Sequence, residues 1–129
     1  MPYRRSHHDV PHAVVANLVN RAVAIIKPRL PYLDWATSIA GSADDVTLDA
    51  LRTDCIAILI PDFDTPAESE AFIAGLAGEL FEMELEAWDR DPATWPEDRS
   101  YEAFRAWFDI EIHSIVMDAS DDDITWEEF

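Results

Sequence analysis

The sequence has 129 residues and a net charge of −18, with 27 acidic residues against 9 basic ones. This length fits one domain with a single core, and a hydrophobic content of 49% is typical of a folded protein rather than a disordered one. Residues 1–43 carry a small positive excess, whereas residues 44–129 hold 25 of the acidic residues. A surface this negative repels phosphate backbones and anionic lipids, so we expect no direct nucleic-acid binding and no membrane partner.

The sequence also predicts a compartment. Cys55 is the single cysteine, so no intrachain disulfide can form, which is typical of a protein in a reducing interior. It lies in an apolar run, and burial there would make the thiol inert. No apolar stretch approaches the roughly 20 residues of a membrane-spanning helix, and residues 1–19 lack a segment of the signal-peptide kind. We therefore expect a cytoplasmic protein, and we assign it no cofactor.

Residues 1–19 are predicted to be a mobile N-terminal extension. Three histidines and an aspartate lie close together there, but their spacing does not favour a metal site: His7, His8, Asp9 and His12. The next run, residues 21–27, is rich in β-branched residues toward its end and predicts a buried strand that stops at Pro28. A short helix over residues 31–40 follows, starting with Pro31.

A second apolar run, residues 55–60, has no polar position. This pattern predicts a strand covered on both faces, in the middle of the sheet. A helical turn or two starting at Thr47 precedes it. The roughly 27 residues between the first two strands suffice for a crossover connection, which would be right-handed.

The clearest boundary in the sequence is the start of a helix over residues 66–88. Asp64 or Thr65 is the expected N-cap, and Pro66 suits the first helical position. Apolar residues recur along one face, while three glutamates lie opposite: Glu79, Glu82 and Glu86. Gly75 and Gly78 weaken a helix, which suggests close packing against the sheet at these positions.

Residues 89–99 are predicted to form a loop. Ser100 is the expected cap of a helix over residues 100–107. The aromatic residues on one face of this helix, including Phe104 and Trp107, are predicted to lie in the core. Trp95, in the Pro-flanked loop, is the expected exposed anchor of a protein interface. Residues 109–117 alternate as a third, more exposed strand. This strand would place Glu111 and His113 on one face, a weak candidate metal or acid–base pair for which a structural histidine is the alternative.

Residues 119–129 form an acidic C-terminal tail with aromatic residues interleaved, which reads as an interaction segment or as disorder. It fails as a calcium-binding loop starting at Asp118, because Asp123 stands where glycine is needed and Phe129 where glutamate is needed. We therefore predict an α+β fold, with a sheet of about three strands and helices packed on it in two layers, over residues 20–118.

Several stretches together resemble a family of short acidic bacterial proteins that has no assigned activity. They are residues 20–35, 54–64 and 80–118, and the last carries Glu84, Leu85, Glu86, Ala87, Trp88, Trp95, Pro96, Arg99, Trp107, Phe108, Glu111, His113 and Ser114. The resemblance implies a bacterial origin and makes the first 18 or so residues an extension. It implies no catalytic residue.

Three functional hypotheses follow. The first is a non-enzymatic protein that binds or regulates a basic protein partner through Glu79, Glu82, Glu86 and Trp95. The second is a small metal-binding protein or metal-dependent enzyme that uses Glu111, His113 and helix carboxylates. The third is a homo-oligomer in which the exposed third strand pairs with its copy.

Overall fold

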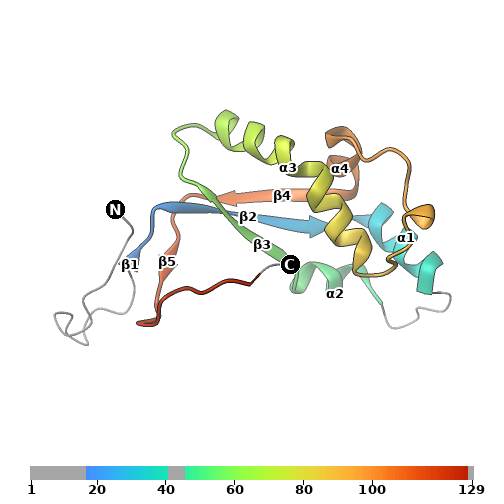
Figure 1. The fold of residues 1–129 in the computed structure, drawn as a ribbon, viewed down its shortest axis with the longest axis horizontal. Coiled ribbons are helices and arrows are strands. Elements are labelled where there is room, and N and C mark those ends of the chain that lie inside the picture. The colour runs from blue at the N-terminus through green and yellow to red at the C-terminus, as the bar shows by residue number, and fades with distance from the viewer. Residues whose placement is uncertain (1–16, 41–45, 128–129) are drawn as a thin grey trace.

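The computed structural model describes residues 17–40 and 46–127, which form an α+β fold (Figure 1). The main sheet is antiparallel and has the order β3-β2-β4, with β2 (Arg21–Pro28) between β3 (Ile56–Pro61) and β4 (Phe108–His113). A short pairing of β1 (Asn17–Leu18) with β5 (Met117–Asp118) lies at one end of it. The predicted fold class is confirmed.

The helices pack on one face and at one end of this sheet (Figure 1). Between β2 and β3 come α1 (Leu30–Ala40) and α2 (Leu48–Thr53), and β3 leads to the long α3 (Pro66–Glu86). The short 3-10 helix η1 (Pro92–Thr94) and α4 (Tyr101–Trp107) then precede β4. In the described residues, no helix combines the length and apolar character needed to cross a membrane.

Local capping explains where α3 and α4 start. The Thr65 hydroxyl accepts a hydrogen bond from the Glu68 backbone N–H at 3.2 Å, and the Glu68 carboxylate accepts one from the Thr65 N–H at 3.1 Å. This reciprocal capping box satisfies N–H groups that the first turn of α3 leaves without partners. Ser100 caps α4 through the Ala103 N–H, so both predicted starts are confirmed.

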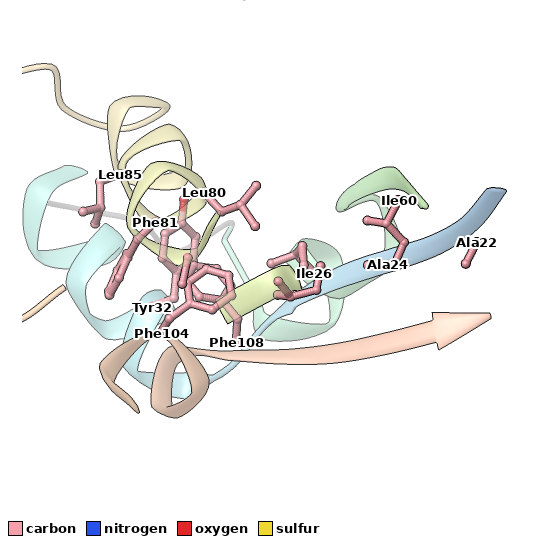
Figure 2. Packing of buried hydrophobic residues seen from close by; sticks show 12 residues of the cluster. Ala22, Ala24, Ile26, Tyr32, Ile60, Leu80, Phe81, Leu85, Phe104 and Phe108 are labelled. Atoms are coloured by element: carbon pink, nitrogen blue, oxygen red, sulfur yellow. The ribbon is translucent and has the colours of Figure 1, made fainter. Parts of the chain in front are cut away.

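The core lies between the sheet and α3. Alternate residues of β2, namely Ala22, Ala24 and Ile26, are buried toward the helices, because successive strand side chains point to opposite faces. Figure 2 shows aromatic rings gathered beside the end of this strand: Tyr32, Phe81, Phe104 and Phe108. Their ring centroids are 4.9–5.8 Å apart in the four contacting pairs, which are tilted or edge-to-face.

The predicted place of β3 in the sheet is wrong. β3 is an edge strand and β2 is central, because β3 pairs only with β2 among the described strands. Ile56 and Ile58 pack against the core, but Ala57 and Leu59 are exposed, Leu59 by 50%. The helices cover a single face of the sheet, so an apolar residue at every position does not mean burial on both faces. The connection from β2 to β3 returns antiparallel and is not a crossover.

The predicted third strand is two elements. β4 ends at His113, and the chain then bends before β5 pairs with β1, supported by a hydrogen bond from the Val19 N–H to the Val116 oxygen at 2.9 Å. Within β4 the predicted alternation holds, because Ile110 packs against the core while Glu111 lies on the opposite face. The sheet arrangement therefore reaches back to Asn17, inside the predicted extension; residues 1–16 lie outside the described residues.

The glycines of α3 do not pack against the sheet. Gly75 and Gly78 are exposed, and a Cβ atom built on either would have no atom within 4 Å. The prediction of close packing at these positions is wrong, because both lie on the outer face of the helix. Residues 119–127 are exposed and contain neither helix nor strand.

Candidate functional site

The three glutamates predicted to face away from the core lie on the outer face of α3. Glu79, Glu82 and Glu86 are all exposed, and we call them the acidic stripe. Glu82 Oε2 is 3.6 Å from Arg99 Nε. Within residues 17–40 and 46–127, no basic side chain forms an ion pair with Glu79 or Glu86. The stripe thus keeps most of its negative charge unbalanced.

Several basic residues are instead held near the sheet. Lys27 Nζ is 3.3 Å from Glu111 Oε1, and Arg52 Nη1 is 3.1 Å from Asp109 Oδ2. Arg29 Nε also lies 3.8 Å from Asp109 Oδ1. These partly exposed pairs hold three of the chain's basic side chains away from the acidic stripe.

Trp95 is not the freely exposed anchor that the sequence indicates. It is half-buried against the core, and its indole Nε1–H donates to the Asp89 backbone oxygen at 2.7 Å. The Arg99 guanidinium carbon lies 5.7 Å from the centre of the Trp95 ring system, within the range of a cation–π contact. Trp95 therefore fixes its loop and Arg99 beside α3. Trp126, in the C-terminal tail, is by contrast 85% exposed.

Glu111 and His113 share the helix-free face of β4, as predicted. His113 Nε2 is 3.5 Å from Glu111 Oε1, the oxygen that also faces Lys27. Hydrogen bonding to Lys27, and then to His113, lowers the pKa of Glu111. The Lys27 ammonium group already faces the carboxylate that this pair would offer to a metal ion. Nowhere in the described ranges do three His, Cys, Asp or Glu side chains gather as a metal site would require.

The structure also reveals a cavity that sequence reasoning missed. It has a volume of about 360 Å³ and opens where α1, α2, the start of β3 and the end of α3 meet. Its lining includes Tyr32, Leu51, Asp54, Cys55, Glu84 and Trp88. This volume falls in the range of small-molecule sites, roughly 300–1,000 Å³.

Glu84 is the chemically distinctive group of this cavity. It is 8% exposed, and its Oε2 atom is buried without a hydrogen-bond partner among the described residues. Burial raises its pKa from 4.5 to about 7, because an ionised carboxylate is costly to remove from water; the nearby Tyr32 hydroxyl acts in the opposite direction. Tyr32 Oη donates to the Glu84 backbone oxygen at 2.6 Å, which fixes α1 against α3.

Cys55 also lines the cavity and is half-buried. Desolvation raises the pKa of its thiol, the opposite of what an activated nucleophile needs. Its Sγ lies 3.6 Å from the Arg52 backbone oxygen. Cys55 is thus a partly exposed thiol that precedes β3, not the fully buried strand residue that its apolar run predicts.

A helical signal for Glu84 was present in the sequence. Glu84 follows Leu80 by four residues and Phe81 by three, and both of those side chains are buried. Residues at these spacings share one face of a helix, so a glutamate there falls within the apolar stripe. Among so many acidic residues nearby, this one position was not distinguished from the exposed glutamates.

Comparison of the chain with protein-family models, with curated proteins and with solved structures finds no match. The resemblance to a bacterial family stays a prediction. Any function must be inferred from the side chains and their surroundings.

Proposed function

We propose that this is a non-enzymatic protein that binds or regulates a basic protein partner through the acidic stripe of α3. The observation that carries the proposal is the exposure of Glu79 and Glu86 without an ion pair to any basic residue of the described chain. A row of unbalanced carboxylates attracts a cationic surface and speeds its encounter with the protein. Glu82 contributes from the same face.

Trp95 has a supporting role in this proposal. It holds Arg99 beside Glu82, and Arg99 is the basic residue that the partner would have to displace or accommodate. Such a contact would favour partners whose basic groups meet the two ends of the stripe, Glu79 and Glu86. Like-charge contact with Arg99 at the centre would disfavour others.

A charge-reversal experiment tests this proposal. The full chain, immobilised, is exposed to a host-cell extract, and the bound proteins are quantified by mass spectrometry for the wild type and for the triple variant Glu79→Lys, Glu82→Lys, Glu86→Lys. The matched control reverses three exposed acids elsewhere, Asp34→Lys, Asp49→Lys and Asp62→Lys, which gives the same net charge.

We expect the wild type and the control to retain a basic protein that the stripe variant loses. With that protein purified, its affinity should fall at least tenfold in the stripe variant, and also as salt rises from about 0.1 M to 0.5 M, because salt screens exposed charges. Equal retention by both triple variants, or no partner at all, would contradict the proposal. Circular dichroism checks that each variant is folded.

We also propose that β4 pairs with its copy in a second chain. β4 is an edge strand whose outer side has no strand partner in the described part of the chain. Ile112, near its end, is 37% exposed. An unpaired edge with an exposed apolar residue is a template for antiparallel pairing across a two-fold axis.

A further inference from the structure

We propose that the cavity beside Glu84 binds a small organic cation, a protonated amine with an apolar body. Glu84 is its counter-ion, and Tyr32 and Trp88 are its aromatic walls. This site is distinct from the acidic stripe, because Glu84 lies on the inner face of α3 and the stripe lies on the outer face.

The first step is that one oxygen of the Glu84 carboxyl group, Oε2, lacks a partner. This atom is buried, and no described residue supplies a hydrogen bond to it. The basic side chains of the described residues that form ion pairs do so with other carboxylates, on the sheet, on the outer face of α3 or near its start. A buried carboxyl oxygen without a partner is costly, and a cationic ligand would remove that cost.

The second step is the chemistry of the walls. Trp88 and Tyr32 line the cavity, and aromatic rings attract a cation when water is excluded; Leu51 adds an apolar group to the lining. The titratable groups that face Glu84 are Tyr32 from α1 and Cys55 and Asp54 from the segment before β3. Of these, Asp54 is exposed and adds a second negative charge at the lining.

The third step excludes other ligand classes. A metal ion would need at least a third ligating group, and the described residues hold no cluster of three. An anion would meet Glu84, Asp54 and a chain of charge −18, because Lys27 and Arg52, the cations that act on Cys55, are already paired with Glu111 and Asp109. A neutral ligand could use the cavity but would leave the Glu84 carboxyl unbalanced once ionised. A protonated amine would balance the charge of Glu84 and interact with the aromatic rings of Tyr32 and Trp88.

Binding of three matched probes tests the proposal: 2-phenylethylamine, its neutral analogue 2-phenylethanol and the anion phenylacetate. Each is titrated into the ¹⁵N-labelled full chain, and amide and indole shifts are followed by NMR. We expect saturable, millimolar binding of the amine, with shifts at Trp88 and Cys55, and at least tenfold weaker binding of the other two. Amine affinity should rise between about pH 6 and pH 8, as Glu84 ionises.

Two variants and a control assign the effect to the cavity. Glu84→Gln should weaken amine binding at least tenfold, remove its pH dependence and leave 2-phenylethanol binding unchanged. Trp88→Leu keeps an apolar wall but removes the aromatic face, so it should weaken the amine more than the alcohol. Glu97→Gln makes the same charge change at an exposed site outside the cavity and should change nothing.

Each contrary result overturns the proposal. These are equal binding of amine and alcohol, the absence of saturable amine binding, unchanged amine affinity in both cavity variants, or shifts that map to the acidic stripe. The partner experiment uses different residues, so failure of one proposal leaves the other standing.

Discussion

Glu84 makes the stability of the fold depend on pH. Its pKa is raised from 4.5 to about 7 in the folded chain, so between these values the folded state holds more protons than the unfolded state. The contribution of Glu84 to the free energy of unfolding therefore decreases by up to about 3 kcal/mol as the pH rises from about 4.5 to 7. Ionised Glu84 opposes folding at high pH, and protonated Glu84 does not.

The variant Glu84→Gln isolates this effect from the many other acids. A neutral amide carries no charge into the interior, so we expect the variant to be more stable than the wild type at about pH 8 and close to it at about pH 5. Urea unfolding of both proteins at the two pH values measures the difference. A difference that does not change with pH would contradict the raised pKa of Glu84.

Single residues were predicted from the sequence where their neighbours along the chain decide their role. Thr65 and Pro66 define the start of α3 by contacts within one turn, and the sequence predicts this start with Asp64 or Thr65 as the N-cap. The exposure and contacts of Trp95 and Glu84 instead depend on side chains that pack against them from distant segments of the chain. The Pro-flanked loop suggested an exposed Trp95, whereas its indole bonds to Asp89 and its ring contacts Arg99.

The outer face of α3 contains two glycines that the fold does not require. A Cβ atom built on Gly75 or Gly78 would have no other atom within 4 Å. Alanine is favoured over glycine in a helix by about 0.8–1 kcal/mol. We therefore expect Gly75→Ala and Gly78→Ala each to raise the free energy of unfolding by up to about 1 kcal/mol, measured by urea denaturation. The reverse change at the exposed Ala71 of the same helix, Ala71→Gly, is the matched control and should destabilise by a similar amount. Destabilisation by either alanine would show that another group approaches this face.

The strands were predicted less well than the helices, for a physical reason. The starts of α2, α3 and α4 depend on local caps, but strand order depends on pairing between residues far apart in the sequence. The run of residues 55–60 is more apolar than β2, yet β2 is central because β3 and β4 both pair with it. Leu59 shows that an apolar residue on this strand can face away from the helices.

The molecule as a whole has two faces of different character. The helix layer presents the acidic stripe, while the helix-free face of the sheet carries Lys27 beside Glu111 and the apolar side chain of Leu59. A basic partner is attracted to the first face. A second copy of this chain is repelled at long range, because both copies carry −18, and has to be held by the β4 edge and its apolar contact.

Salt should therefore act in opposite directions on the two proposed interactions. Screening weakens attraction to a basic partner but reduces repulsion between two identical acidic chains, so we expect the dimer fraction to rise from about 0.05 M to 0.5 M salt. Light scattering over a range of protein concentrations measures it. Ile112→Lys places a charge at the β4 edge and should give a monomer, whereas Leu59→Lys, at the β3 edge, should leave the dimer intact. A monomer at every concentration and salt level would exclude pairing through β4, and loss of the dimer only with Leu59→Lys would move the interface to the opposite edge of the sheet.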